Sequence, residues 1–250
     1  MYPVIHIFGL ELYSFNVCII LAIVVAMLVF IYRTKGIFEL TVQDTLIAIF
    51  GADIPFVLLG AVLHNKIVYA HSFEEFCNSL WKNTGIAFLG GFIGGLIGFL
   101  LLFHFMMKNR IAIKLVMDNV VPSLVLGHAI GRIGCFLGGC CYGKPFFIGV
   151  SYGKSSLAYR TYGDATLFPS QLVEAGILFI MFLVFSKIKS RQTELYLLSY
   201  SVVRFLLEFL RGDSRGNAIG IFSPAQMICI AMFLVGMGIS IWNNGKVKEV

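Results

Sequence analysis

The sequence predicts an all-α integral membrane protein with seven transmembrane helices. Of the 250 residues, 58% are hydrophobic and 13% are charged, and the mean hydropathy is +0.88, whereas soluble domains carry about 25% charged residues. Apolar runs long enough to cross about 30 Å of hydrocarbon recur along the chain. We expect spans near 12–32, 43–63, 85–105, 116–137, 171–187, 194–210 and 221–242. These runs are long and continuous, so helices are favoured over the short alternating strands of a barrel.

Basic residues between the spans predict the orientation. Cytoplasmic loops retain lysine and arginine, and the connections after the odd-numbered spans carry more of them than the others. We therefore expect the amino terminus outside and the carboxyl terminus in the cytoplasm. The first span has neither a basic segment before it nor a small-residue cleavage site, so we expect it to stay in the membrane.

No linker or low-complexity segment divides the chain, so we expect residues 1–250 to form one polytopic membrane domain. The longest connection, 138–170, exceeds a bare turn and is expected to fold over one face of the bundle. The net charge of +6 fits anionic phospholipids of the membrane as partners. It does not indicate nucleic acid, because no soluble basic face is predicted.

Glycines recur every four residues in the third span, at Gly90, Gly94 and Gly98 of FLGGFIGGLIGFL. This spacing puts them on one helical stripe, where another backbone can approach closely. Alternatively, Gly90 and Gly91 keep space open beside a lipid headgroup. The pattern leaves both interpretations open.

The fourth span ends in GHAIGRIGCFLGGCCYG, from Gly127 to Gly143, and carries Arg132 within an apolar run. An arginine there costs about 2.5 to 3.5 kcal/mol on insertion scales and is kept mainly where it meets an anion or water. A capping or snorkelling role is the alternative. His128 lies one turn earlier on the same helix face, where it is either a packing residue or a base.

Three cysteines follow, Cys135, Cys140 and Cys141. Their spacing matches neither the paired CxxC of a structural zinc site nor a redox CxxC. We therefore expect no metal and no cofactor. The alternative is a metal site with His128 as the fourth ligand.

The fifth and sixth spans add further polar groups. Pro169 and Ser170 precede a helix whose first turn holds Gln171 and Glu174, an arrangement that helix capping explains by itself.

On the sixth span, Arg204, Glu208 and Arg211 stand at i, i+4 and i+7 and so share one face. Glu208 either merely neutralises the arginines, or the surplus positive charge holds a phosphate. If this face meets His128 and Arg132, all five side chains would line one cavity.

Three motifs together resemble the prolipoprotein diacylglyceryl transferase family, bacterial seven-span enzymes: GRIGCFLGGCCYG, FPSQLVEA and RFLLEFLRGD. The resemblance covers nearly the whole chain. It implies transfer of a diacylglyceryl group from phosphatidylglycerol to the lipobox cysteine of a prolipoprotein signal peptide, with release of glycerol 1-phosphate. It also implies a multi-pass protein of the bacterial cytoplasmic (inner) membrane.

The resemblance extends to individual residues. Arg132 and Arg204 match the cations that the phosphate leaving group needs, and Glu208 and Arg211 complete the second site. Gly143 matches the terminal glycine of the signature. Tyr13 in LYSF is similar to an early tyrosine of the family.

The sequence also departs from the family. Leu89 stands where many members carry histidine or tyrosine, Cys135 replaces asparagine, and Phe168 replaces the histidine of His-Pro. Leucine cannot accept a proton, so His128, Glu208 or a phosphate oxygen of the lipid remains as the base. The alternative functions are a diverged paralogue with another acceptor and a lipid-binding or transport protein of the same fold.

Overall fold

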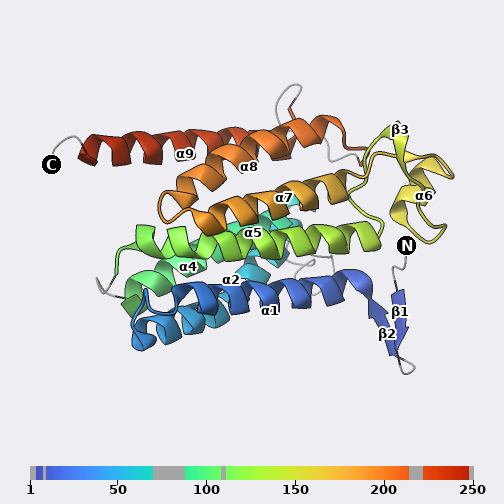
Figure 1. The fold of residues 1–250 in the computed structure, drawn as a ribbon. Coiled ribbons are helices and arrows are strands. Elements are labelled where there is room, and N and C mark those ends of the chain that lie inside the picture. Colours follow the sequence, from blue (N-terminus) through green and yellow to red (C-terminus); the bar gives the residue numbers. More distant parts are fainter. Residues whose placement is uncertain (1–3, 8–9, 70–87, 108–110, 214–221, 248–250) are drawn as a thin grey trace. The chain divides into compact units, whose positions relative to one another are not determined.

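The computed structural model describes residues 4–7, 10–69, 88–107, 111–213 and 222–247 (Figure 1). The helices are α1 Ser14–Thr34, α2 Leu40–Tyr69, α4 Phe88–Met107, α5 Ile113–Leu137, α6 Leu157–Tyr162, α7 Ser170–Lys187, α8 Gln192–Phe209 and α9 Pro224–Val247. The strands are β1 Val4–Ile7, β2 Leu10–Tyr13 and β3 Pro145–Val150. The chain forms two compact units, Thr34–Ile113 and the remainder. The prediction of a single membrane domain stays a prediction.

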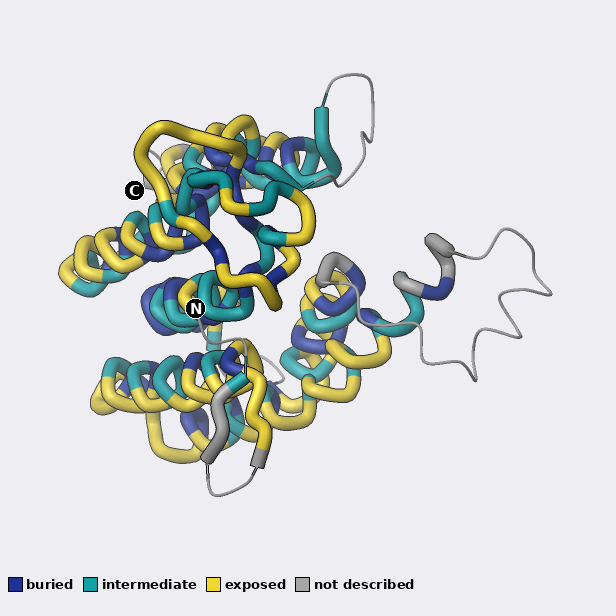
Figure 2. The backbone as a smooth tube through the Cα atoms, turned by 90° about the vertical axis from the view of Figure 1, so that its right-hand side faces the viewer, coloured by how far each residue is buried: buried dark blue, intermediate teal, exposed yellow. Residues whose placement is uncertain are grey.

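Six helices among the described residues are long and apolar enough to cross a membrane. They are Ser14–Thr34, Leu40–His64, Gly90–Met107, Ile113–Leu137, Ser170–Lys187 and Pro224–Asn244. Apolar side chains such as Ile20 and Ile23 lie exposed on them, and Figure 2 shows exposed positions along each long helix, as lipid contact requires. These features agree with the predicted all-α membrane class.

The prediction of seven spans is not confirmed. The predicted span 194–210 forms helix α8, but its 18 residues include Glu194, Arg204 and Glu208. Charged side chains raise the cost of placing a helix in hydrocarbon. The helix is therefore less apolar than the six spanning candidates, and its position relative to a membrane depends on how these charges are paired.

Helices α5, α7 and α8 pack around one hydrophobic core. The buried members of this core are Val121, Val125, Ala129, Leu178, Met181, Phe185 and Tyr200. Helix α1 packs on α5, where Gly134 lies against the side chain of Cys18. Helix α9 packs on α8, with Gly236 against Leu197. The larger unit is thus a helical bundle with α5 and α8 near its centre.

Asp118 of α5 fixes the first turn of α8. The backbone N–H and the hydroxyl of Thr193 donate to Asp118 Oδ1 at 2.9 and 2.7 Å, and Lys114 Nζ lies 2.9 Å from Asp118 Oδ2. A carboxylate at a helix start satisfies free N–H groups and complements the helix dipole. This contact fixes the register of α8 against α5 at the end remote from Arg132.

The connection between α5 and α7 is more than a bare turn, as predicted, and it folds into a small subdomain. It contains β3 and α6 and has its own core of Tyr142, Tyr152, Ala158 and Leu167. Ser156 caps α6 by accepting a hydrogen bond from the Tyr159 N–H at 3.1 Å. The core shows that this loop has a defined structure beside the end of α5.

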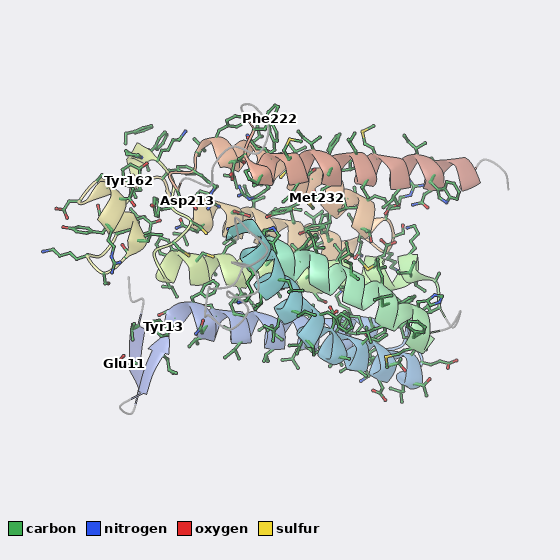
Figure 3. All side chains as sticks on the ribbon, turned by 180° about the vertical axis from the view of Figure 1, so that it is seen from behind. Glu11, Tyr13, Tyr162, Asp213, Phe222 and Met232 are labelled. Carbon is green, nitrogen blue, oxygen red and sulfur yellow. The ribbon has the colours of Figure 1, made fainter. Side chains whose placement is uncertain are left out.

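The hairpin of β1 and β2 was not expected from the sequence. Its antiparallel register pairs Val4 with Tyr13 and Ile7 with Leu10. Tyr13 is the last residue before α1 (Figure 3). Each strand has only four residues. The end of β2 was assigned to the first predicted span because its residues are mostly apolar.

In the smaller unit, α2 and α4 approach through their glycines. A Cβ atom on Gly94 would overlap the Phe56 carbonyl oxygen and lie 3.0 Å from Gly60 Cα, and one on Gly90 would overlap the Gly60 carbonyl oxygen. A Cβ on Gly91 would meet its nearest neighbour, Ala61 Cβ, at an ordinary 3.4 Å. The stripe therefore serves close helix packing, while the lipid role of Gly90 and Gly91 stays a prediction.

We predict that Gly94→Ala destabilises the protein by about 1 to 3 kcal/mol, because the added methyl group collides with backbone that cannot rotate away. Thermal unfolding of the purified protein in detergent measures the effect. Gly51→Ala on α2 is the matched control, because a Cβ there meets nothing within 4 Å, and it should not destabilise the protein. Equal unfolding temperatures for the two variants would contradict the close packing.

Candidate active site

Three helices of the larger unit meet at the carboxylate of Glu174. Arg132 Nη2, from α5, lies 2.9 Å from Glu174 Oε1, and the Tyr200 hydroxyl, from α8, donates to the same oxygen at 2.7 Å. His128 Nε2 lies 3.9 Å from this oxygen, and the His128 ring meets the edge of Tyr200 at 5.2 Å. The Glu174 side chain is 3% exposed. A buried anion thus holds residues from all three helices.

The partner of Arg132 is a carboxylate of the protein. The sequence predicted that its partner is an anion, and in the structure that anion is Glu174 of the protein itself. Arg132 Nε is buried and has no hydrogen-bond partner among the described residues. The guanidinium is therefore neutralised and oriented by Glu174, with one N–H still available.

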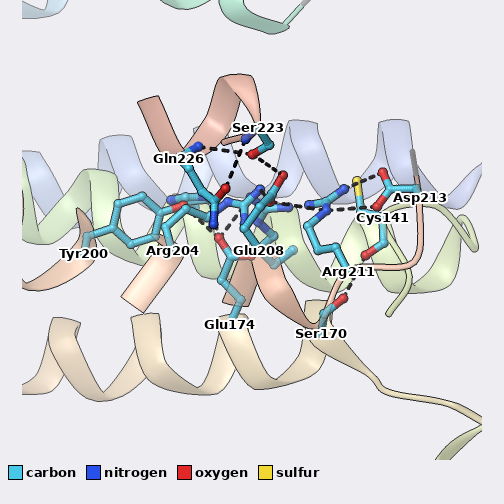
Figure 4. A network of polar contacts seen from close by, with 12 residues as sticks. Cys141, Ser170, Glu174, Tyr200, Arg204, Glu208, Arg211, Asp213, Ser223 and Gln226 are labelled. Carbon is cyan, nitrogen blue, oxygen red and sulfur yellow. Dashed lines mark hydrogen bonds and ion pairs between the residues drawn. The ribbon is translucent and has the colours of Figure 1, made fainter. Parts of the chain in front are cut away.

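The second cluster lies at the end of α8 (Figure 4). Arg204 Nη2 contacts Glu208 Oε2 at 2.6 Å, and Arg211 Nε lies 3.7 Å from the same oxygen. Arg204 Nη1 is buried without a hydrogen-bond partner in the described part of the chain. The predicted helical spacing thus does place Arg204, Glu208 and Arg211 together.

Glu208 is also tied to the start of α9. Ser223 caps this helix: its hydroxyl accepts from the Gln226 N–H at 3.2 Å, and the Gln226 side chain accepts from the Ser223 N–H at 3.0 Å. This reciprocal pair is a capping box. The same Ser223 hydroxyl donates to Glu208 Oε1 at 2.9 Å, so the helix cap also positions the carboxylate.

Asp213 removes the surplus charge that the sequence assigned to this cluster. Arg211 Nε donates to Asp213 Oδ1 at 2.9 Å. Burial alone would lower the pKa of Arg211, but the hydrogen bonds to Asp213 and the nearby Cys141 outweigh it and raise that pKa. Arg132, Arg204 and Arg211 are thus matched by Glu174, Glu208 and Asp213, and an anionic substrate would compete with carboxylates for the guanidinium N–H groups.

Gly143 joins the segments that follow α5 and α8. Its N–H donates to the Phe168 carbonyl at 3.1 Å, while the Gly212 N–H donates to the Tyr142 carbonyl at 2.9 Å. A Cβ on Gly143 would overlap the Phe168 carbonyl oxygen and lie 2.9 Å from the Leu210 carbonyl oxygen. Only glycine permits this approach. Phe168 contributes its backbone to this junction, which a histidine at that position would supply equally.

The first turn of α7 holds the cysteine-rich turn in place. Ser170 Oγ donates to the Cys141 carbonyl at 2.9 Å, and Gln171 Nε2 donates to the Cys140 carbonyl at 2.6 Å. The Tyr152 hydroxyl donates to Gln171 Oε1 at 3.0 Å, and burial raises the pKa of Tyr152, so it remains a donor. Helix capping, the sequence interpretation of this motif, missed these contacts and the role of Glu174. A carboxylate within a predicted span was the available signal.

Cys135, Cys140 and Cys141 form no disulfide within the described part of the chain, and their thiols lie within 4.8 Å of one another. Hydrogen bonds to Cys135 and Cys141, together with burial, raise the pKa of the Cys140 thiol. The neutral thiol is a poor nucleophile at neutral pH. His128, the fourth metal ligand considered from the sequence, lies at Glu174 instead. Among the described residues, the three thiols are the group that could hold a metal ion.

The remaining predicted residues lie elsewhere. Tyr13 is 60% exposed at the start of α1, and a Cβ on Gly138 at the end of α5 would lie 3.7 Å from neighbouring Phe15 Cβ. Tyr13 therefore lies at the same end of the larger unit as the signature. Gly90 and Gly91 belong to the other compact unit. The Leu89 side chain lies outside the described residues.

Comparison with known proteins connects this site to one family. The family model described as prolipoprotein diacylglyceryl transferase matches residues 3–242. A phosphatidylglycerol–prolipoprotein diacylglyceryl transferase 2 of Clostridium perfringens is 32% identical over 260 residues, covering 97% of this chain and 94% of the relative. The phosphatidylglycerol–prolipoprotein diacylglyceryl transferase of Clostridium tetani is 32% identical over 263 residues, covering 100% of both chains. That of Chlorobaculum tepidum is 29% identical over 178 residues, covering 66% of this chain and 58% of the relative.

We predict that Glu174→Gln lowers the free energy of unfolding by about 3 kcal/mol, because it leaves the buried Arg132 guanidinium without a counter-charge. Denaturant unfolding in detergent micelles measures this loss. Glu39→Gln is the control, because Glu39 is exposed, and it should change the free energy by less than about 0.5 kcal/mol. If both variants were as stable as the original chain, the ion pair would not hold the three helices together.

Proposed function

The chain belongs to the prolipoprotein diacylglyceryl transferase family, and we propose that it transfers a diacylglyceryl group from phosphatidylglycerol to the lipobox cysteine of a prolipoprotein. The observation that carries this proposal is the full-length match to enzymes of that name. The buried arginines at the end of α5 and on α8 support it, because they supply the positive charge that a phosphate ester requires. Glycerol 1-phosphate is the second product.

In this reaction the cysteine sulfur of the prolipoprotein attacks a glycerol carbon of the lipid. A carbon–sulfur bond forms, the bond from that carbon to the phosphate oxygen breaks, and the thiol proton passes to a base. Negative charge develops on the departing phosphate ester. Cations fixed before the reaction stabilise this charge without reorganising, which lowers the barrier.

Arg132 and Arg204 are the proposed catalytic cations. Arg132 Nε and Arg204 Nη1 are buried without a hydrogen-bond partner among the described residues, and each guanidinium is oriented by a carboxylate, Glu174 or Glu208. The phosphate would bind to these free N–H groups and displace part of the carboxylate contact. Arg211 adds a third charge at the same end of α8 and completes the proposed phosphate site. The carboxylate partners thus neutralise the arginines until the lipid binds.

His128 is the proposed base. Its side chain is 24% exposed, one helical turn from Arg132, and its Nε2 lies near Glu174. Glu174 would stabilise the protonated imidazole that forms when His128 takes the thiol proton. Glu208 and a phosphate oxygen of the lipid remain the other two candidates. Both are compatible with the role of the arginines.

An apolar groove beside Arg204 suits the acyl chains of the lipid. It measures about 270 Å³ and lies between α8 and α9. Its lining residues are Ser201, Val202, Phe205, Leu206, Cys229, Ile230, Phe233 and Leu234. Arg204 directly precedes Phe205 on α8, so a lipid whose phosphate meets Arg204 would have its tails within reach of this groove.

The proposed topology places the site in the bacterial cytoplasmic membrane. We propose that α8 is the seventh span, because its charges are paired inside the bundle, and that the amino terminus lies outside and the carboxyl terminus in the cytoplasm. Gly143 and Tyr13 would then border the site from the same end of the larger unit. Gly90 and Gly91, in the smaller unit, remain proposed contacts of a lipid headgroup.

Complementation tests the proposed function directly. A bacterial strain depleted of lipoprotein diacylglyceryl transfer should regain growth with this gene, and mass spectrometry should find a diacylglyceryl group on a lipobox cysteine. No added mass, with the protein well expressed, would overturn the proposal. Release of glycerol phosphate without that mass indicates another acceptor, and lipid movement without release indicates transport.

We predict that Arg132→Lys and Arg204→Lys each lower kcat/KM by about 10- to 100-fold. Lysine keeps the charge but loses the planar fork that binds a carboxylate and a phosphate together, and losing one donor at a developing anion costs about 100- to 1,000-fold when no charge remains. Release of glycerol phosphate measures the rate. Arg160→Lys, at an exposed position, should retain full activity. Near-normal turnover of both variants would contradict the proposed roles.

A further inference from the structure

The thiols of Cys135, Cys140 and Cys141 converge from two structural elements. Cys135 lies in the last turns of α5, and Cys140 and Cys141 lie in the turn that follows. Their three sulfur atoms lie within 4.8 Å of one another, and all three residues are half-buried. Sulfur atoms bound to one zinc ion, with Zn–S bonds of about 2.3 Å, lie about 3.8 Å apart. Small side-chain rotations therefore suffice to bring them around one ion.

The backbone holds this turn in a fixed shape. Gly139 and Cys141 both have positive φ, at 68° and 59°, and the Cys140 N–H donates to the Cys135 carbonyl at 3.1 Å. Side chains of α7 also bind the Cys140 and Cys141 carbonyls, as described above. A non-glycine residue with positive φ is uncommon. The surrounding contacts therefore hold Cys141 in a conformation that is unfavourable for the isolated chain.

Two guanidinium groups lie beside the thiols. The Arg211 guanidinium contacts the Cys141 side chain (Figure 4), and Arg132 lies one turn before Cys135, with its charge acting on both Cys135 and Cys141. Nearby cations stabilise a thiolate once a metal ion has displaced its proton. Three thiolates and a divalent ion carry a net charge of −1, and the guanidinium groups of Arg132 and Arg211 lie beside it, each also paired with a carboxylate.

We propose that Cys135, Cys140 and Cys141 form a three-thiolate site for a soft metal ion of the Zn²⁺ or Cu⁺ class. Sulfur ligands select these ions over Mg²⁺ or Ca²⁺. On binding, each S–H bond breaks, a metal–sulfur bond forms, and the protons pass to water. Water completes the coordination of Zn²⁺, because the described residues supply three ligands here. The site borders the arginines of the proposed transfer reaction, but binding does not depend on that reaction.

Titration with Cd²⁺, a spectroscopically visible probe of such sites, tests the proposal. The purified full-length chain, reduced with a phosphine, should show a thiolate-to-cadmium charge-transfer band that saturates at one Cd²⁺ ion per chain. Added Zn²⁺ should displace the Cd²⁺ and remove the band. Cys135→Ser, Cys140→Ser and Cys141→Ser should each weaken Cd²⁺ binding at least about 10-fold, since even outer partners of metal ligands contribute about 10- to 100-fold. Cys18→Ser and Cys229→Ser are matched controls outside the cluster and should bind as the original chain does.

Alkylation of the original chain gives a second measurement that needs no variant to fold. Cd²⁺ should slow maleimide labelling of the peptide that contains the three cysteines, and labelling of Cys18 should be unaffected. The proposal is overturned by absence of the charge-transfer band, by a band that survives replacement of all three cysteines, or by labelling that Cd²⁺ does not slow.

Discussion

A carboxylate buried in a membrane bundle needs a cation, and a buried guanidinium needs an anion. The ion pair of Glu174 with Arg132 satisfies both requirements. Each charge alone would favour leaving the apolar interior, whereas together they keep α5 and α7 in contact. Tyr200 adds α8 through its hydroxyl. The positions of the second arginine cluster follow from this junction, because Arg204 lies one turn beyond Tyr200 on the same helix. The site therefore depends on one carboxylate.

The charge balance decides how such a site can work. Arginines left unpaired in the membrane would destabilise the fold, and arginines fully saturated by carboxylates would not bind a phosphate. Arg132 and Arg204 lie between these limits, since each has a carboxylate partner and one guanidinium nitrogen without a hydrogen-bond partner among the described residues. Substrate binding then exchanges one oxygen anion for another, which costs less than desolvating a free charge.

Hydropathy predicted the helices well, because a span needs only length and apolarity. Helical spacing likewise predicted the Arg204, Glu208 and Arg211 cluster. Contacts between distant segments were missed. Glu174 was interpreted as part of a helix cap, and the pairing of Asp213 with Arg211 depends on how the chain turns after α8. The β1–β2 hairpin was missed because its short apolar strands continue the composition of α1. Local pattern determines elements, whereas the partners of a charge depend on tertiary packing.

The glycine junction has a consequence for biosynthesis. In the sequence, Gly143 precedes α7 and Gly212 follows α8, so the hydrogen bond from the Gly212 N–H to the Tyr142 carbonyl can form only after both helices have been synthesised. Contacts between residues distant in sequence form late, since loop closure precedes them. A nascent chain that ends before Gly212 has Arg132 and Glu174 but lacks the backbone contact between the segments that follow α5 and α8. The contact between the segments that follow α5 and α8 therefore forms near the end of translation.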